Sequence, residues 1–301
     1  MKIKTNVTTA AMLLLCLNSN AQSPAAKQAP EHKQLAAKRA TSPIKLDGVI
    51  DDAAWKDAPM ALGYTELRPT PFRKEADANK TEVYMLYNDE GIYLGGYCHE
   101  VSRDSISTEL RGRDGFGNND WIGFVFDTYD DKLNGFEYFV TPLGEQMDSK
   151  VAPNQNGNNE DFSWNAVWKS AAKINNDGWS FEMFIPFSAI RFSKKNIQDW
   201  GLNIIRRRQR TGQQVFWNAL DPDVNGFLTQ GGKWTGLENI KPPLRLQFSP
   251  YFSTYANHNP YGSGSNQKKW TSSVNGGLDV KYGISQALTL DMTLIPDFGQ
   301  V

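Results

Sequence analysis

The feature that most constrains this chain is a series of short, aromatic-rich segments between residues 43 and 243. The segments are rich in Val, Ile, Phe, Tyr and Trp, which favour β-strands, and stretches rich in Gly, Asn and Asp separate them. Examples are "TEVYMLYND", "GIYLGGYCHEV", "WIGFVFDTY", "GFEYFVTPL" and "GWSFEMFIPF". This pattern predicts an all-β fold, an antiparallel β-sandwich of the jelly-roll kind, and about 200 residues suit one such domain.

One of these segments shows the expected alternation most clearly. In "GWSFEMFIPF", Ser180 and Glu182 fall on one face, and the other face carries four apolar side chains, Trp179, Phe181, Met183 and Ile185. A period of two with apolar residues on one side predicts a strand with one buried face.

The first part of the chain, residues 1–42, does not follow this pattern. Residues 1–21 contain two lysines, an apolar core and then small residues, with Ser19 and Ala21 placed for cleavage before Gln22. This layout predicts a secretory signal peptide, and its apolar core is much shorter than the roughly 20 residues of a membrane-spanning helix. Residues 22–42 are rich in Ala, Lys, Gln and Pro without apolar periodicity, which predicts a flexible tether. We therefore expect a protein of the cell envelope.

Charge and cysteine content narrow the expected environment further. The chain has 32 basic and 33 acidic residues, and cleavage would remove two lysines, leaving a net charge of about −3. This balance gives no basic surface of the kind that a nucleic-acid partner requires. Cleavage would also remove Cys16 and leave Cys98 as the single cysteine, so no internal disulfide could form. The fold must then depend on its apolar core.

Residues 244–301 follow a different pattern. The segments "LRLQFSPYFSTYA", "VNGGLDVKYGI" and "ALTLDMTLIP" alternate apolar and polar residues, each over about ten positions. Two-faced segments of this length are typical of outer-membrane barrel strands. A long polar loop, "NHNPYGSGSNQKKW", joins the first pair, and a tight "SQ" turn joins the second. Outer-membrane barrels place long loops outside the cell and short turns in the periplasm.

These connections predict that the sandwich lies in the periplasm and that residues 244–301 form the first β-meander strands of an outer-membrane barrel. Three strands cannot close a barrel, for which about eight are needed. The chain is therefore expected to be the front part of a longer protein. The less favoured alternative, which the alternation alone also fits, is a three-stranded antiparallel extension of a soluble protein.

An ordered set of phrases in the sandwich region resembles a known family. The phrases are "IKLDGVIDDAAW", "VYMLYNDEGIYLGGYCHE", "NNDWIGFVFDTYDDKLNGFEYFVTPLGE", "DGWSFEMFIPFSAIRF", "WGLNIIRRRQR" and "FWNALDPDVNGFLTQGGKWTGL". Over roughly Pro43–Leu237 they resemble the family 9 carbohydrate-binding modules, which are β-sandwiches. The tail, with its closing "PDFGQV", resembles an uncharacterised outer-membrane β-barrel domain of Bacteroidetes-like bacteria.

The resemblance implies a sugar-binding site. In the family, two aromatic side chains grip a sugar end while neighbouring polar groups bond its hydroxyls. By position, the aromatic residues correspond to Phe116 and Phe227, and the adjacent amide corresponds to Asn225. Trp121 is a further candidate, although its place inside a strand favours the core. Two polar positions of the family differ here, with Gly123 in place of an acidic residue and Phe139 in place of an arginine.

The acidic turn "DTYDDKLN" is a candidate calcium site. Calcium prefers six to eight oxygen ligands, and closely spaced carboxylates can supply several of them. Asp127, Asp130, Asp131 and Asn134 offer such oxygens, and the resemblance also implies structural calcium. The spacing does not match an EF-hand, and Lys132 adds a positive charge. A hairpin connection without metal is the alternative interpretation.

Two other polar stretches carry weaker signals. The loop "APNQNGNNEDFSW" has amides and carboxylates that could bind sugar hydroxyls or calcium, among them Asn154, Asn156, Glu160 and Asp161. The run "RRRQR", Arg206–Arg210, alternates faces and is predicted to be a solvated strand end, with lipopolysaccharide phosphates as an alternative contact.

No catalytic motif stands out. The chain has no "HExxH" and no "GxSxG", the motifs of zinc proteases and of serine hydrolases. A glycosidase needs only two carboxylates at a suitable separation, which a sequence does not reveal. We therefore expect a non-catalytic carbohydrate-binding module. The alternatives are a sandwich without sugar binding that serves as plug or docking domain of the barrel, and a glycoside hydrolase of carbohydrate catabolism.

Overall fold

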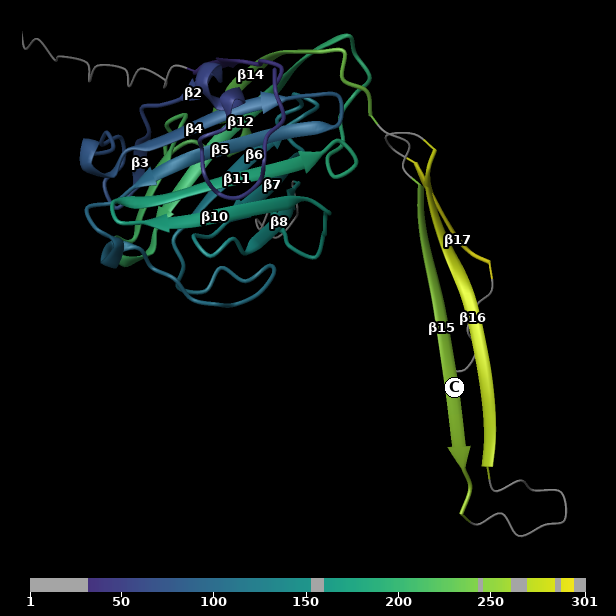
Figure 1. Ribbon diagram of the computed structural model, residues 1–301. Coiled ribbons are helices and arrows are strands. Elements are labelled where there is room, and N and C mark those ends of the chain that lie inside the picture. Colours follow the sequence, from purple (N-terminus) through teal and green to yellow (C-terminus); the bar gives the residue numbers. More distant parts are fainter. Residues whose placement is uncertain (1–31, 153–159, 243–245, 261–269, 285–287, 295–301) are drawn as a thin grey trace, which may run out of the picture.

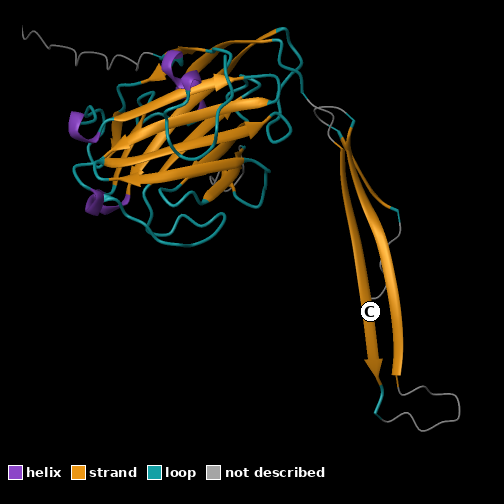
Figure 2. Ribbon diagram, viewed as in Figure 1, coloured by secondary structure: helices purple, strands orange, loops and turns teal. Residues whose placement is uncertain are grey.

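The computed structural model describes residues 32–152, 160–242, 246–260, 270–284 and 288–294. These residues form β-strands and short 3-10 helices, which confirms the all-β prediction (Figures 1 and 2). No helix within these ranges has the length and apolar character needed to cross a membrane. The signal peptide predicted for residues 1–21 and the loop around Asn154 and Asn156 lie outside the described residues.

The larger sheet of the sandwich has nine strands, in the order β1-β14-β12-β6-β7-β8-β9, with β13 and β3 attached beside β12. All pairs are antiparallel except β1 with β14. The strands are β1 Gln34–Ala36, β3 Thr65–Arg68, β6 Trp121–Asp127, β7 Gly135–Val140, β8 Gln146–Val151, β9 Glu160–Asp161, β12 Ile197–Arg208, β13 Gln213–Phe216 and β14 Gly232–Glu238.

The smaller sheet has five antiparallel strands in the order β10-β11-β5-β4-β2. They are β2 Met60–Ala61, β4 Thr81–Tyr87, β5 Gly91–His99, β10 Lys169–Asn175 and β11 Gly178–Pro186. Five 3-10 helices lie in the connections, η1 Ala53–Asp57, η2 Asp77–Asn79, η3 Arg103–Ser105, η4 Gln209–Thr211 and η5 Leu228–Gln230. The two sheets form the layers of the predicted sandwich (Figure 2).

The main core lies between the sheets and is rich in aromatic side chains. Trp179 from the small sheet and Trp200 and Trp234 from the large sheet are fully buried there. Aromatic residues each bury about 150–250 Å² and dominate the energetics of such a core. The apolar face predicted for "GWSFEMFIPF" is confirmed, because all four of its members are fully buried.

The opposite face of the same strand is also covered, which the alternation did not predict. Glu182 is fully buried on β11 and accepts hydrogen bonds from the backbone N–H groups of Asp47 and Gly48 and from Trp55 Nε1. Gly48 has a φ of +81°, and a Cβ there would lie 2.8 Å from the backbone of Ala172. Glycine therefore lets this loop approach the outer surface of the small sheet.

The N-terminal segment is part of the sandwich from residue 32 onward. Gln34–Ala36 forms β1, which pairs in parallel with the edge strand β14, and Leu35 is buried. The backbone of Ala40 also donates a hydrogen bond to the carbonyl of Tyr87. The tether expected over residues 22–42 is thus wrong for its second half, because backbone pairing holds that part against the sheet edge. Residues 22–31 lie outside the described part of the chain.

The tail forms a separate three-stranded antiparallel sheet in the order β15-β16-β17. The strands are β15 Leu246–His258, β16 Trp270–Gly283 and β17 Thr289–Thr293, and Figure 1 shows them extending away from the sandwich. The register places apolar side chains on one face, among them Leu246, Phe248, Val280, Tyr282, Leu290 and Met292. Many are exposed, with Phe252 at 73% and Val274 at 65%. The predicted alternation is therefore present.

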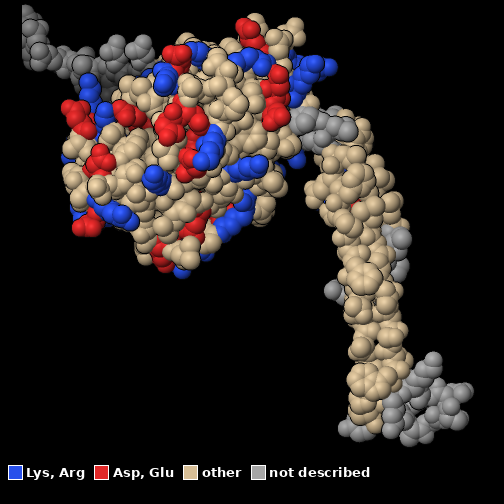
Figure 3. All heavy atoms as spheres, in the orientation of Figure 1, with Lys and Arg blue, Asp and Glu red and all other residues tan. Residues whose placement is uncertain are grey.

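The opposite face of the tail sheet is polar. It carries Gln247, Ser249, Asp279, Lys281, Asp291 and Thr293 at paired positions. Figure 3 shows few charged side chains on the visible side of this sheet, whereas they are spread over the sandwich. The three-stranded sheet thus has one apolar and one polar face.

Candidate functional site

The site expected from the sequence lies on the outer face of the large sheet, which is turned away from the main core. On β6, three residues point inward and are fully buried, Ile122, Phe124 and Phe126. Because side chains alternate along a strand, Trp121 and Gly123 point to the outer face. Trp121 is partly exposed there, and its buried part packs against an apolar cluster on the same face.

Gly123 and Phe139 form one packing unit on this face. They are direct partners in the β6–β7 register, so their side chains lie on the same side of the sheet. A Cβ at Gly123 would lie only 2.2 and 2.4 Å from two ring atoms of Phe139. The ring therefore lies across the glycine, and Phe139 is only 3% exposed. Gly123 and Phe139 are the two positions at which the resembling family has polar residues. Here they make one apolar contact with each other instead.

Around this unit lies an aromatic patch, which we define as Phe116, Trp121, Phe139 and Phe162. The ring centroid of Phe116 lies 5.3 Å from Trp121, 5.1 Å from Phe139 and 5.5 Å from Phe162. Trp121 lies 5.3 Å from Phe139 in an edge-on arrangement. Such contacts contribute about 0.5–1.5 kcal/mol each beyond the buried area. Phe116, Trp121 and Phe162 remain partly exposed and form the accessible part of the patch.

The loop that carries Phe116 is held by hydrogen bonds. The amide nitrogen of Asn119 donates to the carbonyls of Glu109 and Phe116, and its oxygen accepts from the backbone N–H of Glu109. The Glu109 carboxylate accepts from the backbone N–H of Asn118. Asn119 is fully buried, so the backbone under Phe116 is fixed before any ligand arrives.

Phe227 and Asn225 lie in another loop beside η5. The Phe227 ring lies 6.0 Å from Phe216 and packs with Leu228 and Val125 on the outer sheet face. Trp121 also packs against this apolar cluster, so it lies between the two predicted aromatic positions. No ring contact joins Phe116 to Phe227 within the described residues. Asn225 is exposed in the same loop.

A buried carboxyl group lies next to the patch. Glu137 and Phe139 share the outer side of β7, two residues apart, and Glu137 is only 1% exposed. The hydroxyl of Ser149, its neighbour on β8, donates a hydrogen bond to Glu137 Oε2. Burial, with a smaller effect from the charge of Glu160, raises the pKa of Glu137 to about 8. The carboxyl is therefore mostly protonated at neutral pH.

Neither Phe162 nor Glu137 is among the site residues predicted from the sequence. Phe162 carried a usable signal, because it is an aromatic residue in a polar loop, as Phe116 is. Glu137 is the only acidic residue in the apolar strand "GFEYFV". An isolated acidic residue in a fully buried strand indicates either an ion pair or a protonated carboxyl.

In the candidate calcium turn, the carboxylates accept hydrogen bonds from other groups of the same turn. The Asp127 carboxylate accepts from the backbone N–H groups of Asp131 and Lys132 at 3.1 and 2.9 Å. Asp130 pairs with Lys132 and Lys233, which lowers the pKa of its carboxyl although burial opposes this. Asp131 accepts from the side-chain amide of Asn134 at 2.7 Å.

In this structure the carboxylate oxygens of the turn accept hydrogen bonds from its own N–H groups. Among the described residues, no group of three or more His, Cys, Asp or Glu side chains is placed to hold a metal ion. Calcium at Asp127, Asp130 and Asn134 remains a prediction, which a calorimetric calcium titration tests directly.

The prediction of a solvated end for Arg206–Arg210 is wrong for the first arginine. Arg206 is fully buried, and its guanidinium donates to Glu100 Oε1 at 2.8 Å and to the carbonyl of His99 at 2.6 Å. Arg208 donates to both oxygens of the same Glu100 carboxylate at 2.7 Å. The two arginines therefore belong to a structural charge network and do not form an anion-binding surface.

The fold and this face define the class, an antiparallel β-sandwich with an aromatic patch on the outer side of its larger sheet. Residues 242–301 match the family model described as "Domain of unknown function (DUF5916)". No curated protein matches the chain.

Solved structures share the sandwich fold. A candidate carbohydrate-binding protein from Bacteroides uniformis ATCC 8492 is similar with a TM-score of 0.55 and 12% identity, over 68% of this chain and 99% of that one. A family 9 carbohydrate-binding module from Caldicellulosiruptor kristjanssonii in complex with cellotriose has a TM-score of 0.47 and 14% identity, over 67% and 93%. A family 9 module from the same organism in complex with glucose has a TM-score of 0.48 and 13% sequence identity, over 70% of this chain and 100% of that one. At these identities the similarity shows the fold alone.

Proposed function

We propose that the sandwich is a non-catalytic module that binds a carbohydrate at the aromatic patch. The observation that carries this proposal is the partly exposed group of Phe116, Trp121 and Phe162 on the outer face of the large sheet. A sugar ring presents C–H groups that pack against aromatic faces, and its hydroxyls need hydrogen-bond partners when they lose water.

Polar groups at the edge of the patch could supply those partners. Arg207 is the register partner of Trp121 on β12 and therefore lies on the same side of the sheet. Its guanidinium donates to the carbonyl of Gly212 and to Gln209 Oε1, and it has five N–H donors in all. Glu109 is partly exposed in the loop under Phe116. In this proposal, Arg207 and Glu109 take the role that polar residues at positions 123 and 139 have in the family pattern.

The Bacteroides protein with the same sandwich fold, itself a candidate for carbohydrate binding, gives independent support. This similarity concerns the fold alone, so the kind of sugar bound has to be inferred from the aromatic patch. The patch is formed by side chains of a sheet and its adjoining loops, and it suits an exposed glycan end more than a long enclosed chain.

The test is a glycan array probed with the full 301-residue chain in detergent solution. The best glycan is then titrated against the protein and against Trp121→Ala and Phe116→Ala by calorimetry. We expect each variant to bind about tenfold more weakly, by analogy with the stacking of a nucleic-acid base on one aromatic ring, which is worth on the order of 1–3 kcal/mol. The matched control is Phe184→Ala, a partly exposed aromatic residue of the small sheet that contacts Tyr93. Equal affinity in all variants contradicts the proposal.

We further propose that the sandwich lies in the periplasm and that β15, β16 and β17 begin an outer-membrane barrel. The exposed apolar face of this three-stranded sheet, with a polar face behind it, supports this context. Calcium at the acidic turn is not needed for either proposal.

A second candidate function is that of a plug or docking domain for the barrel. It is favoured by one specific observation, that Phe139 lies over Gly123 and fills the place where the family pattern has polar residues. Absence of binding to every glycan on the array, with a folded protein, would favour this function over carbohydrate binding.

A further inference from the structure

A hollow with no assigned role lies at the opposite side of β7 and β8, facing the interior of the sandwich. It has a volume of about 350 Å³ and is lined by Tyr129, Asn134, Phe136, Lys150 and Arg191, among others. Phe136 and Lys150 are register partners, so both side chains point into this hollow from neighbouring strands. Phe136 is buried and belongs to the main core, which makes the floor of the hollow rigid.

The loop that supplies Arg191 is fixed in place. The hydroxyl of Tyr138 donates to the carbonyl of Ala189 at 2.8 Å. The hydroxyl of Thr128 donates to the carbonyl of Arg191 itself. Both anchors come from the large sheet or from the turn that follows β6. The Arg191 guanidinium therefore projects from a segment with a defined position.

Two positive charges meet at this hollow without an ion pair. Within the described residues, neither Lys150 nor Arg191 has a carboxylate partner at salt-bridge distance. The pKa of Lys150 is lowered, first by burial and then by the positive charge of Arg191. An anion in the hollow would raise the pKa of Lys150 again, because a nearby opposite charge favours the charged ammonium form.

The nearby carboxylates accept hydrogen bonds within their own loops. Asp131 lines the hollow, but its carboxylate accepts from the backbone N–H groups of Leu133 and Asn134 and from the Asn134 side chain. The Asp161 carboxylate accepts from the backbone and hydroxyl of Ser163. Asp161 is the register partner of Lys150, and its charge partly opposes the lowering of the Lys150 pKa, but among the described residues no carboxylate lies within salt-bridge distance of either cation.

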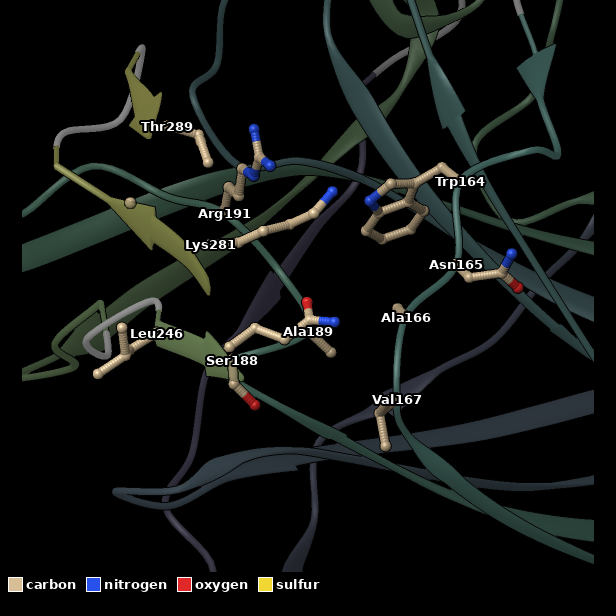
Figure 4. A pocket seen from close by; sticks show the side chains of 12 residues that line it. Trp164, Asn165, Ala166, Val167, Ser188, Ala189, Arg191, Leu246, Lys281 and Thr289 are labelled. Atoms are coloured by element: carbon tan, nitrogen blue, oxygen red, sulfur yellow. The ribbon is translucent and has the colours of Figure 1, made fainter. Parts of the chain in front are cut away.

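An aromatic ring, that of Trp164, lies beside Lys150. The ring of Trp164 lies 5.3 Å from Lys150 Nζ and 5.4 Å from the ring of Phe136. Trp164 lines an adjoining hollow, to which Arg191 also contributes, and Figure 4 shows the two on facing sides of it with Lys281 of β16 between them. Trp164 is partly exposed, so one part of its indole is free to meet a ligand. Cations beside a tryptophan suit a ring that carries a negative group.

We propose that Trp164, Lys150 and Arg191 form a second binding site, for a sugar that carries an anionic group. The sugar ring packs against Trp164, and its carboxylate or phosphate accepts hydrogen bonds from Arg191 and Lys150. The guanidinium can bond such a group with two parallel N–H donors, whereas the ammonium acts as a point charge. The amide of Asn134 lies at the rim for a hydroxyl. This site is separate from the aromatic patch and does not depend on it.

The experiment is a calorimetric titration of the full chain with trigalacturonate and with its fully methyl-esterified form. The two probes share the same rings and differ in charge. We expect the acidic trimer to bind at least about tenfold more tightly, and more weakly as sodium chloride is raised, because salt screens charge pairs. Equal binding of the two trimers, or no binding of any acidic sugar, overturns the proposal.

Two further probes identify the anionic group. Tighter binding of glucose 6-phosphate than of trigalacturonate supports the site and assigns phosphate as its preferred group, and the reverse order supports it and assigns the carboxylate. Inorganic phosphate bound as tightly as both sugars overturns the proposal, because it removes the role of Trp164.

Variants locate the site on the protein. Arg191→Gln and Trp164→Leu are each expected to weaken acidic-sugar binding at least about tenfold. Arg210→Gln, which changes an exposed arginine elsewhere on the sandwich, is the matched control. Trp121→Ala is also expected to leave this binding unchanged, which separates failure here from failure at the aromatic patch. If Trp164→Leu does not fold, Arg191→Gln still decides, and unchanged affinity in that variant contradicts the proposal.

Discussion

Replacing Glu137 with glutamine tests the buried carboxyl group beside the aromatic patch. The pKa of this group is about 8 in the folded protein, against an ordinary value of 4.5. Burial is the main cause, because it disfavours the charged form. In the unfolded chain the carboxyl ionises near its ordinary value, so the unfolded state gains stability over the folded state as the pH rises from 4.5 to 8.

The size of the effect follows from the difference in pKa. Each pKa unit corresponds to about 1.4 kcal/mol. At pH 7 the wild-type protein is therefore less stable than at pH 4.5 by about 3 kcal/mol from this group alone. Glutamine cannot ionise, and its oxygen can still accept the hydrogen bond from Ser149. We expect Glu137→Gln to raise the free energy of unfolding at pH 7 by about 3 kcal/mol and to change it little at pH 4.5.

The assay is chemical denaturation at a series of pH values from 4 to 8, followed by tryptophan fluorescence. Trp179, Trp200 and Trp234 are buried in the main core, so the signal reports on the sandwich. The control is Glu238→Gln, which replaces an exposed carboxylate on the sandwich edge. Equal pH dependence in wild type and Glu137→Gln would contradict a raised pKa for Glu137, and so would a variant that is less stable than wild type at pH 7.

Three further predictions concern packing, charge and processing. Gly123→Ala is expected to destabilise the sandwich by about 1–3 kcal/mol, because its Cβ would collide with the Phe139 ring. Adding Phe139→Ala should remove much of the collision, and a double-mutant cycle from thermal unfolding checks this coupling. Arg206→Met is expected to cost about 3–5 kcal/mol, because it leaves Glu100 buried with one partner fewer, and guanidinium denaturation measures the decrease in stability. N-terminal sequencing of the protein from an outer-membrane fraction is expected to begin at Gln22, whereas an uncleaved protein in the cytoplasmic fraction would contradict export.

Much of the sandwich is predictable from local patterns. Alternation in "GWSFEMFIPF" correctly predicted that Trp179, Phe181 and Met183 face the core. This works because a strand's period of two is a local property of the backbone. The alternation in the tail is likewise reproduced by the register of β15 with β16, where Phe248 pairs with Val280.

What the sequence did not predict depends on contacts between distant parts of the chain. Glu182 looks like a polar outer residue, but the segment around Gly48 and Trp55 covers it and satisfies its carboxylate. Arg206 looks solvated, but its partner Glu100 lies more than a hundred residues earlier in the chain. Local pattern cannot reveal a partner that the fold brings from elsewhere.

The candidate site likewise has features that the sequence indicated and features that it did not. The sequence singled out Phe116 as an aromatic residue in a polar loop, and the structure places its ring 5.3 Å from that of Trp121. It did not reveal that Phe162, just after β9, joins them, because that contact is made between residues more than forty positions apart in the chain. Nor did it show that Gly123 and Phe139 compensate each other across two strands.

Carbohydrate binding at the aromatic patch is tested most directly by the structure of the protein in complex with the best glycan from the array. We expect a sugar ring within about 4 Å of the rings of Trp121, Phe116 or Phe162, the distance at which apolar groups are in contact. A sugar bound away from the outer face of the large sheet, with these rings unchanged and uncovered, would contradict it.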